Sequence, residues 1–241
     1  MAARNRIEIP RMSVLAIIPA AGMGLRMGSG TPKQFLSLDG VPIFVHTLRK
    51  FSSSSAVDVI YLGVRPEEMD RVAEALGSER LAKRVRVVAG GVTRHETVDK
   101  ALDAAPPDTE LVLVHDAVRP FVELEMISRV VEAARRGGAA ILGIPSVDTV
   151  KQVERQIILG TLPRERIVLA QTPQAFRYAI LRDAFSRART EGYVGTDESS
   201  LVERLGTNVT VLMGSDRNIK ITKPSDLALA RLYLAQEAEM A

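Results

Sequence analysis

The feature that most constrains the fold is a series of short apolar runs that recur between helix-like segments. The first, VLAIIPA, occupies residues 14–20. Further runs lie at 57–64, 85–89, 111–115, 139–144 and 209–213, and helix-like segments lie at 42–51, 66–76, 93–105 and 124–136. A continuous β-branched run is typical of a parallel strand that is covered on both faces. The alternation predicts an α/β protein with an open, doubly wound, mostly parallel sheet that binds ligands at the carboxyl ends of its strands.

Residues 145–170 break this alternation, because they contain short strand-like runs with no convincing helix between them. They predict a β-hairpin arm that projects from the sheet. Such an arm has little core and two exposed edges, so we expect it to pack against a second subunit in a homodimer; a hairpin folded back on its own domain is the alternative. Helices are predicted again at 173–190, at 197–205 and from Pro224 onward. We expect a loose N-terminal tail over 1–12 and a single domain, including the arm, over 13–241.

The composition excludes several classes of function. The 241 residues include no cysteine and no tryptophan, only 4% are aromatic, and the net charge is +3. Without cysteine, thiolate metal sites, disulfides and cysteine nucleophiles are impossible. The scarcity of aromatics and the lack of a dense basic block argue against nucleic acid, and no apolar run is long enough to span a membrane. We therefore expect a cytoplasmic protein that handles small anionic substrates.

A glycine-rich loop follows the first predicted strand, within IIPAAGMGLRMGSGTPKQF at 17–35. The spacing Gly22-x-Gly24 resembles a dinucleotide-binding turn, but Gly28, Gly30 and Pro32 follow too soon for the long helix that such a turn must open. The spacing of a Walker A loop is absent. A loop that grips a triphosphate agrees better with these residues.

The small residues of this loop allow backbone N–H groups to approach a phosphate chain closely. They are Ala20, Ala21, Gly22 and Gly24. Arg26 and Lys33 add two cations to the same loop. Two fixed cations suit a triphosphate, because charge grows at the bridging oxygen as pyrophosphate departs. Together with PKQF, the pattern resembles the signature of sugar and polyol phosphate nucleotidyltransferases.

Asp116 ends the strand LVLVH and precedes AVRPF. A carboxylate at the carboxyl end of a strand is well placed to hold Mg²⁺ or another divalent cation, whereas a helix-capping or turn aspartate is the structural alternative. Arg119 is expected to bind a second anion. The turn in AGGVTRHET, at 89–97, is expected to meet a base or ribose, with Arg94 and Thr97 nearby. The sequence offers no catalytic triad, and a phosphate monoester that attacks an α-phosphorus needs none, because it is already an anion.

Seven motifs in order resemble the family of 2-C-methyl-D-erythritol 4-phosphate cytidylyltransferases, of the non-mevalonate isoprenoid pathway, over about residues 14–235. They are AAGMGLRM…PKQF, AGGVTRHETV, VHDAVRPF, SVDTVKQV, AQTPQAF, GTDESSLVE and NIKITKPSDLALA. The resemblance implies a Rossmann-like nucleotidyltransferase fold and Mg²⁺-dependent transfer of CMP from CTP to methylerythritol phosphate, giving 4-diphosphocytidyl-2-C-methyl-D-erythritol and pyrophosphate.

The resemblance also implies roles for individual residues. Arg26 and Lys33 would stabilise the transition state, and Arg164 and Lys220 would aim the substrate phosphate at the α-phosphorus. The nucleotide would be bound by Ala20, Ala21, Gly22, Gly24, Gly91, Val92, Thr97 and Ala117. Methylerythritol phosphate would be held by Arg119, Thr149, Thr172 and Thr196, and the metal by Asp116. In the family the arm completes the partner's site, so Arg164 and Thr149 would act across the dimer.

Some alternatives stay open. Leu25 stands at a position that is often basic in relatives, which would weaken the long-range attraction of the nucleotide without abolishing activity. Ribitol-5-phosphate cytidylyltransferase shares the glycine-rich loop and HDAVRPF, although GTDESS and SDRNIK favour the methylerythritol enzyme. A non-catalytic nucleotide-binding regulator on the same scaffold and a Rossmann oxidoreductase are more distant possibilities.

Overall fold

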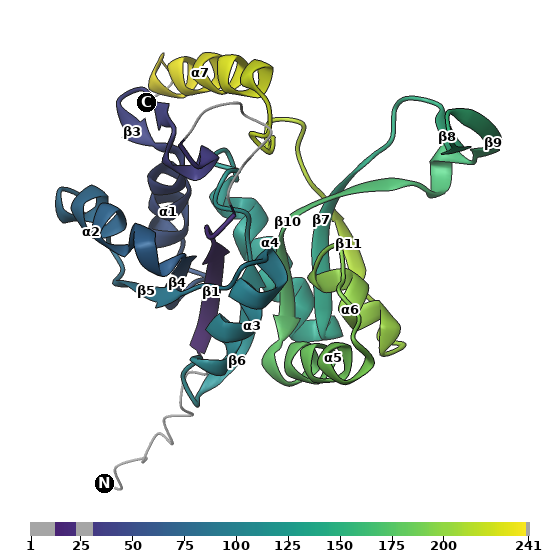
Figure 1. Ribbon diagram of the computed structural model, residues 1–241, viewed down its shortest axis with the longest axis horizontal. Coiled ribbons are helices and arrows are strands. Elements are labelled where there is room, and N and C mark those ends of the chain that lie inside the picture. The colour runs from purple at the N-terminus through teal and green to yellow at the C-terminus, as the bar shows by residue number, and fades with distance from the viewer. Residues whose placement is uncertain (1–12, 23–30, 240–241) are drawn as a thin grey trace, which may run out of the picture.

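The centre of the protein is a seven-stranded sheet in the order β11-β7-β10-β6-β1-β4-β5 (Figure 1). The structure is a computed structural model that describes residues 13–22 and 31–239. The sheet strands are β1 (Ser13–Pro19), β4 (Val59–Val64), β5 (Val85–Ala89), β6 (Thr109–Val114), β7 (Ala139–Pro145), β10 (Val168–Arg177) and β11 (Thr210–Met213). Neighbouring strands run parallel except around β10, which is antiparallel to both β6 and β7. The prediction of an open, mostly parallel α/β sheet is confirmed.

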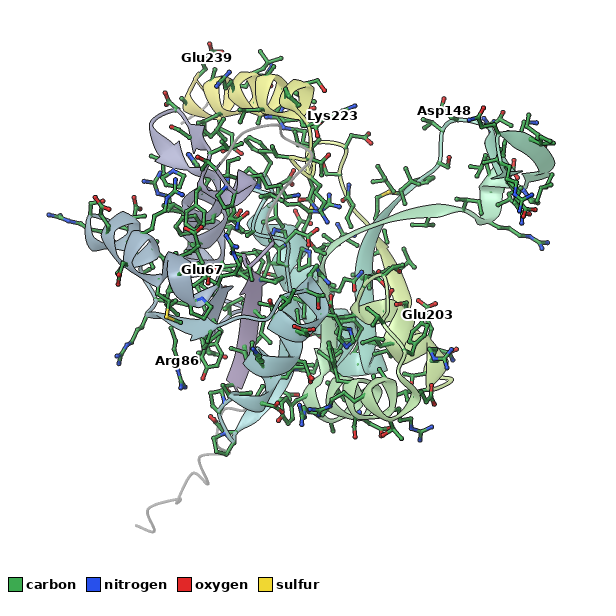
Figure 2. The ribbon with its side chains drawn as sticks, viewed as in Figure 1. Glu67, Arg86, Asp148, Glu203, Lys223 and Glu239 are labelled. Carbon is green, nitrogen blue, oxygen red and sulfur yellow. The ribbon has the colours of Figure 1, made fainter. Side chains whose placement is uncertain are left out.

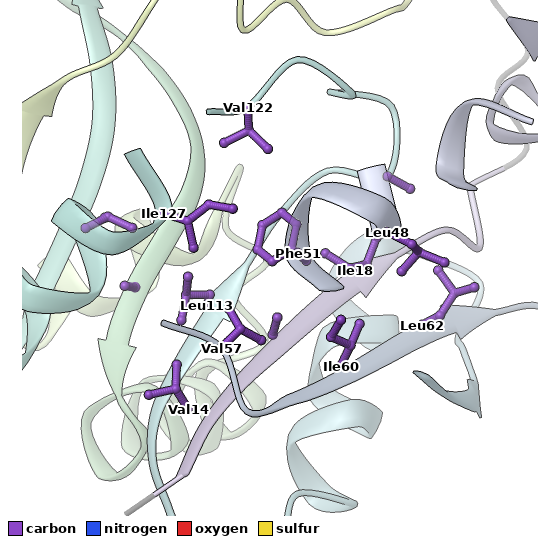
Figure 3. Packing of buried hydrophobic residues seen from close by; sticks show 14 of the residues in the cluster. Val14, Ile18, Leu48, Phe51, Val57, Ile60, Leu62, Leu113, Val122 and Ile127 are labelled. Atoms are coloured by element: carbon purple, nitrogen blue, oxygen red, sulfur yellow. The ribbon is translucent and has the colours of Figure 1, made fainter. Parts of the chain in front are cut away.

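Helices cover both faces of this sheet, because successive strand residues point to opposite sides. In β1, Val14, Ala16 and Ile18 enter one buried cluster, while Leu15 and Ile17 enter the other. The first cluster (Figure 3) is completed by α1 (Ile43–Ser53), α2 (Met69–Gly77) and α4 (Leu124–Gly137). The second is completed by α3 (Arg94–Asp103), α5 (Tyr178–Glu191) and α6 (Glu198–Arg204). The buried strands thus explain the continuous apolar runs of the sequence.

A third, smaller cluster joins the C-terminal helix α7 (Pro224–Glu239) to the strand ends. It contains Ala230 of α7 together with Phe121, Val118 and Ile221. The short strands β2 (Ser37–Leu38) and β3 (Val41–Pro42) and the 3₁₀ turns η2 (Lys33–Phe35) and η3 (Pro66–Glu68) complete this end of the body. Within 13–22 and 31–239, no helix is both long and apolar enough to cross a membrane.

Two boundaries predicted from the sequence, on either side of β10, are wrong. The arm was expected to extend to residue 170, but β10 begins at Val168. The segment 173–190 was expected to be helical throughout, but its first five residues belong to β10, and α5 begins only at Tyr178. Strand β10 is hard to recognise because Gln171, Thr172 and Gln174 are polar although they are buried. These side chains are accommodated by hydrogen bonds that the fold supplies from distant segments, which local periodicity cannot reveal.

Residues 146–167 leave the sheet and form a separate hairpin. Strands β8 (Val150–Glu154) and β9 (Ile157–Leu162) pair antiparallel, and η4 (Arg164–Arg166) leads back into β10. The two-residue turn places Arg155 and Gln156 in the left-handed region, at φ 46° and 70°, as a tight hairpin turn of matching twist requires. Figure 1 shows this hairpin, hereafter the arm, standing out from the body beyond β7 and β10.

Candidate active site

The glycine-rich loop begins where the carboxyl ends of β1, β4 and β5 meet. The N–H of Ala20 donates to the carbonyl of Gly63 at 2.7 Å, and the N–H of Gly90 donates to the carbonyl of Val64 at 2.6 Å. A Cβ atom added to Gly90 would lie 2.9 Å from the Cβ of Ala21. The start of the loop and the turn at 90–91 therefore pack against each other without room for a larger side chain.

Gln34 holds the beginning of the loop in place, which the sequence did not predict. This side chain is buried on η2, and its Nε2 donates to the carbonyls of Ala20 at 2.6 Å and Gly22 at 3.0 Å. The bonds bring η2, and with it Lys33, next to the backbone of the loop. Two predicted residues of the loop, Gly24 and Arg26, lie outside the described residues, as does Leu25.

The predicted base-binding turn is shaped by the side chain of Thr97. This residue is fully buried, and its hydroxyl accepts the N–H of Gly91 at 3.0 Å and donates to the carbonyl of Thr93 at 2.8 Å. A side chain on Gly91 would overlap Glu96. Because the hydroxyl of Thr97 is already used on both sides, a base bound at this turn would meet the backbone and Val92, which is 87% exposed.

Three cations converge on the carboxylate of Asp116, just beyond the end of β6. Arg94 Nε lies 3.1 Å from Oδ1, while Lys220 Nζ and Arg119 Nε lie 2.9 and 3.4 Å from Oδ2. The side chain of Asp116 is only 8% exposed. Burial would favour the neutral acid, but the charges of Arg94, Lys220 and Arg119 outweigh it and hold the pKa of Asp116 well below its usual range. The carboxylate is therefore ionised at neutral pH.

A buried histidine fixes the backbone next to this carboxylate. His115 is fully buried, and its Nε2 lies 3.0 Å from the carbonyl of Arg119, which can only accept a hydrogen bond. Its Nδ1 lies 3.1 Å from the hydroxyl of Thr172, which in turn accepts the N–H of Asp116 at 3.0 Å. Burial, only partly opposed by the bond to the Arg119 carbonyl, lowers the pKa of His115 to about 4. A neutral His115 with its proton on Nε2 satisfies every one of these bonds.

The segment that carries Lys220 is tied to the same place. The side chain of Asn218 is fully buried, and its Nδ2 donates to the carbonyl of Thr172 at 2.9 Å, while the backbone carbonyl of Asn218 accepts from Arg119 Nη1 at 2.7 Å. Ala117 is likewise held, because its carbonyl accepts the hydroxyl of Thr47 at 2.9 Å. The fold thus brings together Asp116, Ala117, Arg119, Thr172 and Lys220, which the sequence places on three separate segments.

The remaining predicted substrate-binding residues lie apart from this cluster. Thr149 and Arg164 are exposed on the arm, and Arg164 Nη1 donates to the carbonyl of Val147, also on the arm, at 3.0 Å. In Figure 2, Asp148, the neighbour of Thr149, lies on the arm outside the body. Thr196 is exposed and directly precedes Asp197, the N-cap of α6.

The residues at Asp116 fit a divalent cation that is bound chiefly through substrate phosphates. In 13–22 and 31–239, no group of three or more histidines or carboxylates gathers as a metal cage. Mg²⁺ is commonly bound by one or two carboxylates together with the phosphates of a nucleotide, so a single ionised carboxylate at the same edge of the sheet as the glycine-rich loop would meet the requirement.

Two further residues belong to the site: Glu198, which was not predicted as functional, and Arg94, which was named only as lying near the turn expected to meet a base or ribose. The guanidinium of Arg94 forms two bonds to the carboxylate of Glu198, at 2.7 and 2.9 Å, besides its contact with Asp116. Glu198 lies within the motif GTDESS, and Arg94 follows the turn at 90–91. They are 104 residues apart. No local signal in the sequence pairs them.

Comparison with known proteins identifies the family. The family model "IspD: 2-C-methyl-D-erythritol 4-phosphate cytidylyltransferase" matches residues 14–236. Proteins of that name from Solibacter usitatus and Acidobacterium capsulatum are 53% and 51% identical; the alignments cover 94% of this chain in both cases, and 98% and 99% of theirs.

Solved structures agree. The crystal structure of 4-diphosphocytidyl-2C-methyl-D-erythritol synthase from Anaerococcus prevotii superposes with a TM-score of 0.82 at 32% identity, covering 92% of this chain and 96% of that one. The 2-C-methyl-D-erythritol 4-phosphate cytidylyltransferase from Thermus thermophilus gives a TM-score of 0.74 at 36% identity, covering 92% and 98%. The chain therefore belongs to the 2-C-methyl-D-erythritol 4-phosphate cytidylyltransferase family.

Proposed function

We propose that this protein transfers CMP from CTP to 2-C-methyl-D-erythritol 4-phosphate in the cytoplasm, as a step of the non-mevalonate isoprenoid pathway. The observation that carries the proposal is the arrangement of charged residues at the carboxyl end of the sheet. There the buried carboxylate of Asp116 lies against Lys220 and Arg119, at the same edge of the sheet as the glycine-rich loop that follows β1.

The chemistry needs placement and charge neutralisation more than proton transfer. A phosphate oxygen of methylerythritol phosphate forms a bond to the α-phosphorus of CTP, and the bond from that phosphorus to the bridging oxygen breaks, releasing pyrophosphate. No proton has to be removed from the attacking phosphate. Neutral, fully buried His115 agrees with this, because it holds backbone groups rather than facing a substrate.

The residues divide between the two substrates. The triphosphate is bound by two cations, Lys33 and Arg26, and by the backbone of the small residues Ala20, Ala21, Gly22 and Gly24. The base is received by the turn at Gly91 and Val92, which Thr97 shapes. Ala117 contacts the ribose and the α-phosphate. Lys220 and Arg119 attract the phosphate of methylerythritol phosphate, and Thr172 and Thr196 border it. The guanidinium of Arg119 keeps further N–H groups for this role, because within 13–22 and 31–239 it bonds only Asp116 and the backbone carbonyl of Asn218.

Asp116 is the residue that would hold Mg²⁺, which when bound neutralises the charge of the α-phosphate and orients it. Its ionised state suits that role. Because Lys220 and Arg119 already face Oδ2, a bound cation would have to share this carboxylate with them.

We further propose a homodimer in which the arm of each subunit reaches the partner's site with Thr149 and Arg164. The arm carries a concentration of exposed apolar side chains, which are Val147, Val153, Ile157, Ile158, Leu159 and Leu162, with Val168 and Leu169 at its base. An apolar surface of this extent is typical of a surface that a partner covers.

The direct test is pyrophosphate release from CTP and Mg²⁺ with methylerythritol phosphate and ribitol 5-phosphate offered in parallel. We expect release with methylerythritol phosphate. Release with ribitol 5-phosphate alone would reassign the substrate. Binding of CTP without release in the presence of either phosphate would favour a non-catalytic regulator.

A further inference from the structure

Among the charged residues of the site, Arg94 occupies an unusual position. It is the first residue of α3, where the positive end of the helix dipole disfavours a cation. It is held there by two carboxylates from other elements, Asp116 beyond β6 and Glu198 at the first turn of α6. A cation that depends on two distant anions for its place is suited to fix their relative positions.

The geometry of Arg94 leaves it little capacity to bind a phosphate directly. Nη1 and Nη2 face the two oxygens of Glu198 at 2.7 and 2.9 Å, the paired arrangement that the planar guanidinium favours, and Nε faces Oδ1 of Asp116 at 3.1 Å. The side chain of Glu198 is only 2% exposed. The N–H groups of Arg94 that a phosphate would need are therefore already bonded to Glu198 and Asp116.

We infer that Arg94 and Glu198 are positioning residues for the proposed transfer reaction. Arg94 holds Oδ1 of Asp116 while Lys220 and Arg119 hold Oδ2, so the carboxylate plane is set from both sides. Glu198 holds the guanidinium in turn, and it lies two residues after Thr196. The two ion pairs Glu198–Arg94 and Arg94–Asp116 thus connect the start of α6 to the carboxylate of Asp116. The start of α6 lies beside Thr196, which is proposed to bind methylerythritol phosphate, and Asp116 is proposed to act on the nucleotide. This inference rests on the proposed function.

A purely structural ion pair between α3 and α6 would predict different behaviour, and a double substitution separates the two roles. Arg94→Met and Glu198→Met each leave a buried charge without its partner, so both should lower the unfolding midpoint and the turnover number. In the double variant neither charge is present, and an apolar pair of similar size can fill the space. We expect the double variant to recover most of the unfolding midpoint but to keep kcat at least 30-fold below wild type.

Arg182→Met is the matched control. Arg182 ties α5 to α3 through Asp103 at 2.6 Å and Asp99 at 3.6 Å, on the same face of the sheet but without contact to Asp116. It should lower the unfolding midpoint and leave kcat within threefold of wild type. Recovery of both stability and kcat in the double variant would overturn the inference, and so would an equal loss of kcat in the control.

Arg94→Lys and direct binding measurements keep the test decisive if the methionine variants fail to fold. Lysine retains the charge but cannot span Asp116 and Glu198 together, so we expect kcat to fall at least tenfold with KM for CTP changed by less than threefold. Calorimetric titration of CTP, with and without Mg²⁺ and without the second substrate, should show a smaller gain in affinity from Mg²⁺ than in wild type. An unchanged gain together with unchanged kcat would overturn the inference. A wild-type protein that binds CTP with Mg²⁺ but releases no pyrophosphate would instead refute the proposed function.

Discussion

The strand-end cluster around Asp116 and the arm show opposite relations between side chains and their surroundings. In the cluster, charged and polar groups are buried, and they find partners within the chain, as the three cations around Asp116 do. On the arm and its base, eight of the fifteen large apolar side chains that the described residues expose lie within 147–169. The cations and the carboxylate of the cluster meet within one chain, whereas the arm is proposed to pack against a second chain. The proposed site, which draws on both, would need a stable body and a subunit interface at the same time.

The largest expected effect is the loss of the charge at the centre of the cluster. Asp116→Asn leaves Arg94, Arg119 and Lys220 converging on a neutral group. We expect kcat to fall roughly 1,000-fold and the free energy of unfolding to fall by about 3 kcal/mol. Steady-state pyrophosphate release and urea unfolding measure the two quantities.

Asp58→Asn is the control for this substitution. Asp58 accepts the N–H of Val14 at 2.9 Å, near the amino ends of the strands. A loss of stability with unchanged kcat is expected there. Should Asp116→Asn also leave kcat unchanged, Asp116 would be a structural residue and the proposed site would be wrong.

The next effect concerns the pH dependence of stability. Burial lowers the pKa of His115 to about 4 from its ordinary value of 6.5. Between these values the unfolded chain binds a proton that the folded protein excludes, so the free energy of unfolding decreases as the pH falls from 6.5 to 4. The expected loss from this residue is about 3 kcal/mol.

Urea unfolding of wild type and His115→Gln across this range isolates the contribution, because other titrating groups act in both proteins. The variant should be less stable at pH 7 but lose less on acidification. Equal slopes in the two proteins would show that His115 binds its proton at the same pH in the folded and unfolded states, which would contradict the lowered pKa.

The third effect tests whether the arm serves the partner. Lys33→Ala and Arg164→Ala should each lower kcat roughly 100-fold. In a mixture at equal concentrations, half of the dimers are mixed and one of their two sites is intact, so about a quarter of wild-type activity should return. Subunit exchange is verified with tagged chains. If exchange occurs and activity stays low, Arg164 serves its own subunit.

The smallest effect on the body is expected from the tip of the arm. Ile157→Glu with Leu159→Glu places two charges on β9, where the side chains are 67% and 57% exposed. Sedimentation should show monomers at micromolar concentration, while the unfolding free energy of the monomeric body changes by less than about 0.5 kcal/mol.

Val194→Glu charges an equally exposed apolar residue away from the arm, at 67% exposure, and should leave the oligomer intact. A double variant that sediments like wild type would assign the apolar surface of the arm to some other role.

The fold class was predictable because a buried parallel strand appears in the sequence as a continuous apolar run. Val14 to Ile18 form an apolar run because the run is covered on both faces. Strand β10 has no such run, because Gln171, Thr172 and Gln174 are buried polar residues whose hydrogen-bond partners come from elsewhere in the chain. Its first residues were assigned to the arm and its last residues to a helix.

The candidate site divides in the same way. By itself, the sequence determined which residue types stand at the strand ends, because glycine turns, an aspartate after a strand and nearby cations are local features. Only the tertiary structure decided which of them act on one another: Lys220 reaches Asp116 from a segment more than a hundred residues away, and Arg94 meets Glu198 across 104 residues. Ion pairs and buried hydrogen bonds depend on distance in space, and only the folded chain brings these groups within reach.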